Sequence, residues 1–317
     1  MDLPAYDELP RAAHGGPTAR SLFGEDDNLG LINLLTPERV AAAARLIRRG
    51  AVFSLNAEIT AFDPPLYGRG RATHRIIRTP GDPDLDDALD GFNPQASSQW
   101  DSLAHAPGVD GRWYNGVSFA EIAQGGRDTI DHWARRGIAG RGVLLDVERL
   151  LDEAQGYDPF TSVSVSVEQL ERCRGAAGLE YRPGDILLVH TGFAARYQQL
   201  PAARREALAD WKQFTAVGLE HTEAMVRYLW NSHLAAVATD APAVEVWPPD
   251  HRAAAAPYGY LHQVLIPELG MALGELWWLA DLARDCREEG VYEMFVSSAP
   301  LNVAGGISSP PNALAVK

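Results

Sequence analysis

The sequence predicts an α/β fold in which a mixed β-sheet is flanked by helices. In the second half of the chain, short apolar runs typical of buried strands alternate with segments of helical pattern. Hydrophobic residues make up 46% of the 317 residues and charged residues 22%, which is enough apolar material for a large core. Because neither an internal repeat nor a linker divides the sequence, we expect one domain over residues 1–317, with an extended arm over about residues 1–35.

The first third of the chain predicts one helix, one strand and a long loop-rich region. Residues 36–50 form the expected helix, which Thr36 can cap and Gly50 can end in the left-handed conformation. In residues 51–59, apolar and polar side chains alternate, which predicts a strand. Residues 60–112 are interrupted by prolines, and long irregular segments of this kind are usually functional or disordered.

In the rest of the chain, predicted helices and strands alternate more regularly. Ser166 and Gln169 have capping-box spacing at the start of one predicted helix. The expected helices span residues 118–126, 131–137, 166–174 and 218–233. The expected strands and apolar runs span residues 142–147, 184–192, 234–242, 262–266, 291–300 and 312–316.

Charge and composition narrow the class of partner. The chain has 28 Lys and Arg against 42 Asp and Glu, a net charge of −14, whereas nucleic acids and anionic membranes require a positive surface. We therefore expect no nucleic-acid or membrane partner. The charge says little about a small-molecule substrate, which is expected from the candidate site described below. The two cysteines lie outside any metal-binding spacing, and the N-terminal residues carry no apolar signal segment, so a cytoplasmic protein is expected.

A first pair of chemistry-bearing residues lies in QASSQWDSLAH, residues 95–105. On a helix, Asp101 and His105 would share a face, and the carboxylate could then orient the imidazole. The alternative is an exposed capping Asp beside an incidental His. The loop-rich setting and the aromatic cluster DGRWYNG (110–116) that follows both favour a functional site.

A second group of polar residues appears later in the chain. Asp240 follows an apolar strand, where α/β proteins often place sites, although it also suits a turn. Glu245 and His262 follow, and a lone His is more often structural. Glu275 is flanked by Leu and Trp, so we expect it to be buried and to need a partner or a metal. His190 could reach a site at a strand end or bond a loop carbonyl. Glycine-rich nucleotide motifs and the GxSxG hydrolase motif are absent from the sequence.

Eight stretches in order along the chain resemble the cyclase superfamily, which includes kynurenine formamidase and isatin hydrolase. They are NLGLINLLTPERVAAAARLIRRG, QWDSLAH, RWYNG, RGVLLD, GDILLVHTGF, AAVATDAPAVE, LHQVLIPELGMALGELWWL and APLNVAGGISSPPNALAV. The nearest branch comprises longer members with a QWD variant. The resemblance implies a swivelling β/β/α fold, a homo-oligomer (dimer or tetramer), and metal-dependent hydrolysis of amide, lactam or similar bonds.

The family signature HxGTHxDxxxH maps onto residues 95–105. Its two metal-binding His become Gln95 and Gln99, its Gly-Thr pair becomes Ser97–Ser98, and Asp101 and His105 match. The later His and Glu of the family site match His262 and Glu275. The implied metal ligands are therefore Gln95, Gln99, Asp101, His262 and Glu275.

This ligand set departs from the family pattern in its chemistry. Amide oxygens replace two imidazoles, so the set is oxygen-rich and suits manganese or magnesium better than zinc. One divalent ion (Mn, Mg or Zn) is the resulting expectation, and a metal-free site is the competitor. In both the metal-bound and the metal-free site, we expect His105 to act as general base and acid and Asp101 to assist it. The expected substrate-binding residues are Trp100, Ser98, Trp113, Tyr114 and Asn115.

Three functions remain open at this point. The first is a hydrolase of an amide, lactam, lactone or related bond. The second is a metal-independent cyclase, dehydratase or lyase of secondary metabolism. The third is a binding homologue that retained the scaffold without catalysis.

Overall fold

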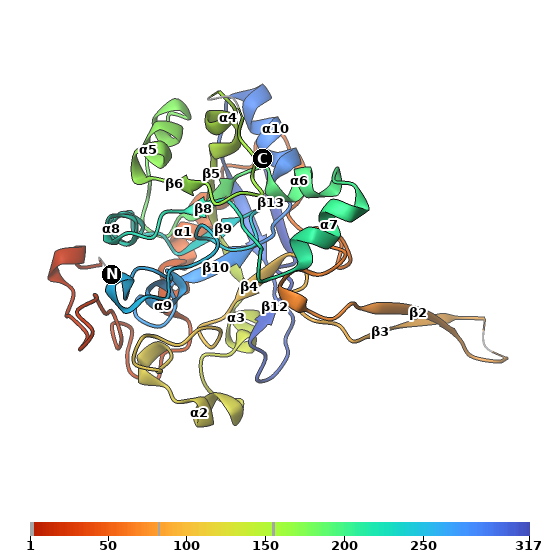
Figure 1. Cartoon of the computed structure of the whole chain (residues 1–317), viewed down its shortest axis with the longest axis horizontal. Helices are drawn as coiled ribbons and strands as arrows, with labels where there is room; N and C mark the ends of the chain where they lie inside the picture. The colour runs from red at the N-terminus through yellow and green to blue at the C-terminus, as the bar shows by residue number, and fades with distance from the viewer. Residues whose placement is uncertain (1–2, 82, 154–155) are drawn as a thin grey trace.

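The computed structural model describes residues 3–81, 83–153 and 156–317 (Figure 1). At its centre is a mixed sheet. Its strands are β1 (Val52–Ser54), β4 (Gln99–Asp101), β5 (Ile138–Asp146), β7 (Ile186–His190), β9 (Ala236–Thr239), β10 (Ala272–Glu275), β11 (Glu293–Ser298), β12 (Ser308–Ser309) and β13 (Ala313–Val316). Their order across the sheet is β1-β13-β11-β5-β7-β9-β10-β4-β12. The predicted α/β architecture with a mixed sheet is therefore confirmed.

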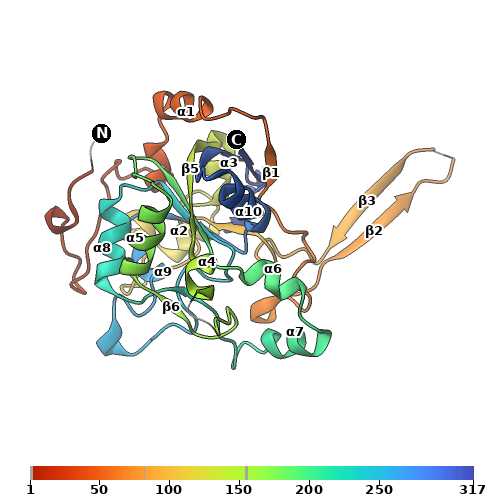
Figure 2. The same ribbon diagram turned by 90° about the horizontal axis from the view of Figure 1, so that it is seen from above.

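Helices flank this sheet (Figure 2). They are α1 (Pro37–Ala44), α2 (Phe119–Ala123), α3 (Ile130–Arg136), α4 (Val147–Asp152), α5 (Val167–Ala176), α6 (Phe193–Gln198), α7 (Ala202–Ala209), α8 (Glu223–Asn231), α9 (His262–Leu265) and α10 (Ala280–Glu289). α1 packs on β5 and β11, α5 on β5, and α4 on β7. Among the described helices, none is long and apolar enough to cross a membrane.

Four neighbouring strands, β5, β7, β9 and β10, run parallel to one another. Parallel strands are covered on both faces, which is why these runs are mostly apolar and buried. Their carboxyl ends meet at one edge of the sheet, and each ends in or is followed by a polar residue: Asp146, His190, Asp240 and Glu275. This edge is where an α/β sheet places its sites.

The two N-terminal capping predictions are confirmed, but the prediction that Gly50 ends the first helix is wrong. The Thr36 side chain accepts a hydrogen bond from the Arg39 amide, and Ser166 and Gln169 form the capping box of α5. α1 ends at Ala44 rather than near Gly50, because the chain turns there to pair with β13's end. The amides of Arg49 and Ala51 both donate to the Lys317 carbonyl.

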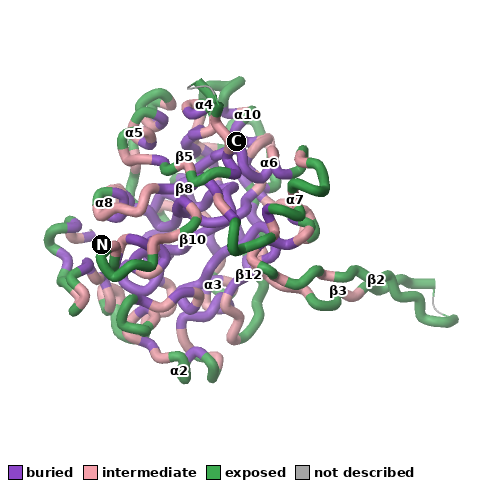
Figure 3. Tube along the Cα trace, in the orientation of Figure 1, coloured by how far each residue is buried: buried purple, intermediate pink, exposed green. Residues whose placement is uncertain are grey.

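The loop-rich region contains more regular structure than its prolines predict. β2 (Thr73–Arg78) and β3 (Leu85–Asp90) form a hairpin that projects away from the body and is exposed along its length (Figure 3). Two other predictions need correction. The run 262–266 is the short helix α9, and residues 218–219 form β8 (Gly218–Leu219), which pairs with β6 (Ser164–Val165) before α8 begins.

The buried carboxyl group of Asp128 makes a prediction about the stability of the fold possible. It is 1% exposed, both of its carboxylate oxygens have no hydrogen-bond partner, and burial raises its pKa to about 8. The folded state thus holds the proton more tightly than the unfolded state. The stability this contributes is fully present below about pH 4 and falls as the pH rises toward 8.

We therefore expect Asp128→Asn to stabilise the protein at pH 9 by about 2–5 kcal/mol relative to the parent chain, and by much less at pH 5. Urea unfolding at the two pH values measures this difference. An equal gain at both values would show that the charge of Asp128 is not the cause.

Candidate active site

The candidate site begins on β4, which lies between β10 and β12 in the sheet. Gln99 pairs with Glu275 and Asp101 with Leu273 in an antiparallel register. Because side chains alternate along a strand, Gln99 and Asp101 project to one face and Trp100 to the other. Asp101 therefore does not lie on a helix, as its spacing to His105 suggested. It lies on β4, the second strand from one edge of the sheet, and the following turn carries His105.

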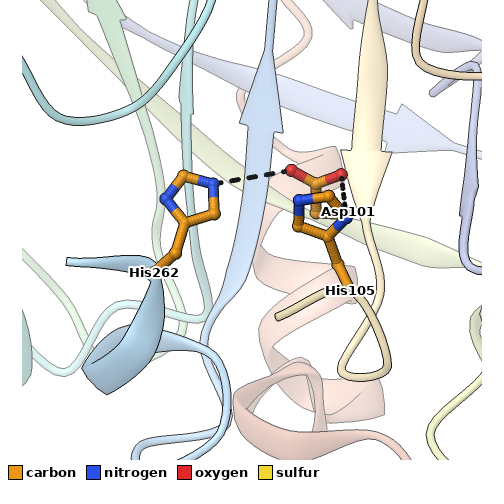
Figure 4. A group of neighbouring side chains, drawn as sticks. All are labelled: Asp101, His105 and His262. Carbon is orange, nitrogen blue, oxygen red and sulfur yellow. Dashed lines mark ion pairs between the residues drawn. The ribbon is translucent and has the colours of Figure 1, made fainter. Parts of the chain in front are cut away.

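Asp101 contacts two imidazoles (Figure 4). Its Oδ1 lies 3.5 Å from His105 Nδ1, and its Oδ2 lies 3.8 Å from Nε2 of His262, the first residue of α9. His262 Nε2 is also 3.1 Å from Glu275 Oε1. The fold thus gathers Asp101, His105, His262 and Glu275, which the sequence analysis assigned to one site.

His262 is held as a cation by Glu245. Both carboxylate oxygens of Glu245 lie 2.8 Å from His262 Nδ1, and the two residues are buried. Burial opposes the imidazolium charge, but the charge of Glu245 outweighs it and raises the pKa of His262 well above its usual range. The Tyr260 ring stacks on the imidazole at a centroid distance of 5.0 Å and so fixes its plane.

Glu275 is buried and paired, as its apolar flanks predicted. Its residue exposure is 3%, and it accepts hydrogen bonds from Gln99 Nε2 at 2.7 Å and from the Val244 amide at 3.1 Å. Burial, together with the neighbouring charge of Asp101, raises the pKa of Glu275 to about 7. A carboxyl group tuned to this range can hold or release a proton near neutral pH.

His105 is the most accessible of these side chains. It is 22% exposed, whereas the Asp101, His262 and Glu275 side chains are 0%, 3% and 4% exposed. Burial lowers the pKa of His105 despite the opposing charge of Asp101, so the imidazole is neutral at pH 7. Gln95 Nε2 lies 2.9 Å from His105 Nδ1 and 3.3 Å from Asp101 Oδ1.

Two of the expected substrate-binding residues belong to the core instead. The Trp100 ring is fully buried, meets Trp277 and Trp133 edge-on, and donates its indole N–H to Ser298 Oγ. The Ser98 hydroxyl donates to the Leu276 carbonyl and accepts from the Ala57 amide. The alternation of β4 is the reason: its middle residue must point away from Asp101.

The aromatic and amide cluster 113–115 anchors the N-terminal segment instead of lining the site. The Tyr114 hydroxyl donates to Asp27, and the Asn115 amide bridges the carbonyl of Gly24 and the amide of Ser21. Trp113 packs with a small separate cluster of Ala104, Val117, Ile122 and Ile307. The predicted contacts of Trp113, Tyr114 and Asn115 with substrate are therefore not supported by their positions.

A family model described as "Putative cyclase" matches residues 40–246, which is more than half of the chain. The chain belongs to this family. A solved structure described as a novel cyclase is 32% identical, with a TM-score of 0.82 over 95% of this chain and 99% of that chain.

Other solved structures share the fold at lower identity. An isatin hydrolase bound to the product analogue thioisatinate is 13% identical, with a TM-score of 0.60 over 83% of this chain and 91% of that chain. Isatin hydrolase A from Ralstonia solanacearum is 18% identical, with a TM-score of 0.58 over 89% and 97% of the two chains. No functionally curated protein matches the sequence.

The cyclase-family site contains residues that a metal could use. Asp101, His105 and His262 each bring one ligand atom to within 4.8 Å of the others. The Gln99 Oε1 is a buried acceptor without a hydrogen-bond partner, which is what a carbonyl-type ligand offers. Gln95 points its Nε2 toward Asp101 and His105, so it contributes a donor there and no ligand oxygen.

Three residues near this site were not assigned from the sequence. Glu245 was recognised as polar but not as the partner of His262; its signal is a carboxylate inside the apolar run AVEVW, the same signal that identified Glu275. Arg69 donates to the Gln95 carbonyl, and the Tyr67 ring lies under its guanidinium at 4.9 Å. Tyr67 also meets Trp247 and Phe214 edge-on, so an aromatic wall comes from residues that carry no sequence signal.

Proposed function

We propose that this cyclase-family protein is a hydrolase of an amide, lactam, lactone or related C–N or C–O bond in a small molecule, with aromatic compounds first among the substrates. The observation that carries the proposal is the neutral, accessible His105 beside the buried group of Asp101, His262 and Glu275. The aromatic wall of Tyr67 and Trp247 suits a flat substrate. The isatin hydrolases with the same fold agree with this substrate class.

In the proposed reaction, His105 accepts a proton from the attacking water and then delivers it to the leaving nitrogen or oxygen. This step needs the tautomer whose proton lies on Nδ1, facing Asp101 Oδ1 at 3.5 Å, so that Nε2 can accept the proton of the water. It therefore also requires the Gln95 amide, whose Nε2 now lies 2.9 Å from Nδ1, to turn its oxygen toward the ring. The imidazolium of His262 places a fixed positive charge beside the site, which can stabilise the oxyanion that forms as water adds to the carbonyl. The C–N or C–O bond then breaks as the carbonyl re-forms.

The proposal also includes one divalent metal ion at this site. Asp101, His262 and Glu275, with the Gln99 carbonyl oxygen, would hold manganese or magnesium in preference to zinc because three of these four donors are oxygen. His262 would have to release its Nε2 proton to bind, so the ion would replace the imidazolium charge described above. When bound, such an ion supplies Lewis-acid polarisation and lowers the pKa of water.

The test is a panel of small substrates: an isatin-type lactam, an N-formyl anilide and an aromatic lactone. Each is incubated with the protein as purified, after chelation, and after addition of Mn²⁺, and products are identified by mass spectrometry. The proposal expects a ring-opened product heavier by one water from the lactam or the lactone, and formate with the free aromatic amine from the anilide. A product lighter by one water, or an isomer of the substrate, would instead favour the dehydratase or cyclase function. Binding without turnover would favour the non-catalytic function. Turnover that survives chelation would remove the ion from the proposal and leave His105.

We further propose that the protein is a homo-oligomer in which the β2–β3 hairpin packs on a second copy. An isolated two-stranded hairpin is marginally stable in water, and this one exposes apolar side chains, with Ile76 70% and Leu85 63% exposed. Replacing residues 73–90 with a short Gly-Ser turn is expected to reduce the molar mass to that of a smaller assembly, measured by light scattering after size exclusion. An unchanged oligomer would exclude the hairpin as the interface, and a monomeric parent chain would exclude the assembly itself.

A further inference from the structure

A second polar cluster lies at the carboxyl edge of the parallel strands. Asp146 ends β5 and pairs in register with His190, which ends β7. Val189 pairs with Thr239, so Asp240, the next residue, lies beside His190. Glu148, in the first turn of α4, completes the cluster: its Oε2 lies 3.6 Å from His190 Nε2.

This cluster is distinct from the candidate active site. Glu275 is level with Thr239 across the β9–β10 pair, because Gly274 pairs with Ala238. Neighbouring residues on a strand point to opposite faces, so Asp240 and His190 lie on the other face of the sheet from Glu275 and Asp101. The function proposed for the active site does not use these residues.

Three residues of the cluster share one arrangement: one polar atom is held by the protein and the other is left open. His190 Nδ1 is 2.9 Å from Asp146 Oδ1. Asp240 Oδ1 accepts from the amide and hydroxyl of Thr191, at 2.6 and 2.7 Å. Glu148 Oε1 accepts from Arg196 Nε at 2.8 Å.

The open atoms converge. His190 Nε2 and Asp240 Oδ2 have no hydrogen-bond partner, although both residues are only 1% exposed. Buried polar atoms without partners are rare and need an explanation such as an ion. Nε2 lies 4.0 Å from Asp240 Oδ2 and 3.6 Å from Glu148 Oε2. Ligands bound to one tetrahedral ion at about 2.1 Å are about 3.4 Å apart, so each of these two oxygens lies near the separation from Nε2 that a shared ion requires.

The charges around the cluster also favour a cation. Three carboxylates, those of Asp146, Glu148 and Asp240, surround His190. Arg287 contacts Asp146 Oδ2 at 3.1 Å, and Arg196 contacts Glu148, but each binds the outer oxygen of its partner. Asp240 accepts from the hydroxyl and the amide of Thr191, and among the described residues its one ion-pair partner is His190, 4.0 Å away.

The backbone at Gly192 leaves room for the Glu148 side chain to approach His190. Gly192 has a φ of +79°, and a Cβ at that position would lie 2.2 Å from Glu148 Oε1. Only glycine therefore lets the carboxylate pack against the start of α6 with its Oε2 directed toward His190. A cluster of carboxylates alone would not require this approach.

We propose that His190 Nε2, Asp240 Oδ2 and Glu148 Oε2 form a second site, for a divalent transition-metal ion such as Zn²⁺ or Mn²⁺. Asp146 orients the imidazole through Nδ1, the arrangement by which carboxylates commonly support metal-bound histidines. The ion would tie the ends of β7 and β9 to α4 and so stabilise this edge of the sheet.

The test separates this site from the active site by variants of each. The full-length protein, Asp240→Asn, Asp101→Asn and the double variant are dialysed against Zn²⁺ alone and, separately, Mn²⁺ alone, and bound metal is counted by mass spectrometry. Asp240→Asn keeps an acceptor for Thr191 and should lower the stoichiometry by one ion in both backgrounds. Glu148→Gln, whose side chain is partly exposed, should weaken the same ion by at least about 10–100-fold.

A second readout is thermal. Zn²⁺ should raise the melting temperature of Asp101→Asn but not that of the double variant. Equal stoichiometry with and without Asp240 would overturn the proposal, as would the absence of bound metal in Asp101→Asn. In the latter case His190 is simply a protonated imidazole between carboxylates. If the active site binds no metal but the second site does, the ion that depends on Asp240 will still be counted. A wrong proposal for the active-site metal is therefore distinguishable from a wrong proposal for the second site.

Discussion

Replacing His105 with glutamine is expected to lower kcat by about 10²–10⁴-fold, with little change in melting temperature. His105 is the accessible member of the site, and its lowered pKa keeps it neutral and able to accept a proton. Glutamine is similar in size and can keep a hydrogen bond to Gln95, but it cannot exchange protons near neutral pH. The measurement is steady-state turnover of whichever panel compound the parent chain hydrolyses.

His132→Gln is the matched control. His132 lies on α3, and among the described residues its side chain bonds the Gly126 carbonyl and Arg135, so its replacement should leave turnover unchanged. Full turnover by His105→Gln would remove this residue from both the hydrolytic and the metal-free mechanisms. A fall in affinity with unchanged kcat would assign His105 to binding.

Replacing Glu245 with alanine is expected to cost about 3–5 kcal/mol of folding free energy, the range for breaking a buried ion pair by removal of one partner. Glu245 is 0% and His262 2% exposed, so the imidazolium would be left without its counter-charge. His262 could lose its proton in response, which limits the loss but also removes the positive charge from the site.

Glu245→Gln is the matched variant, because it keeps an acceptor for His262 Nδ1–H and removes only the charge. Urea unfolding of both variants at pH 7 gives the two free energies, and the alanine variant should lose more. If alanine prevents folding, the glutamine variant alone still measures the charge. A loss below about 1 kcal/mol in both would show that the pair contributes little.

Several local features of the structure follow directly from short stretches of sequence. Thr36 and the Ser166–Gln169 pair cap their helices because capping depends on residues three apart. β7 and the second half of β5 were recognisable as apolar runs, since strands covered on both faces are mostly apolar. The first half of β5 was missed; it contains the buried Arg141, which pairs with Asp185. Glu275 stood out for the converse reason, as a carboxylate between large apolar side chains.

The errors have an equally physical origin. β4 is three residues long, too short for its alternation to be recognised, so Asp101 was read at helical spacing and Trp100 was assigned to the pocket. The hairpin of β2 and β3 is exposed on both faces, and without a buried face its hydrophobic pattern carries little information. Glu245 could not be paired with His262, because the segment between them folds back through loops of no regular period.

By itself, the sequence determined the family, the alternation of strands and helices, and the polar residues that end the parallel strands. Only the tertiary structure decided which of these polar residues meet. Strand register places Asp101 and Glu275 on one face and His190 and Asp240 on the other. A shift of one residue would exchange the faces, and register is set by the packing of the whole sheet. The composition of each site is therefore a long-range property that no single stretch of the chain contains.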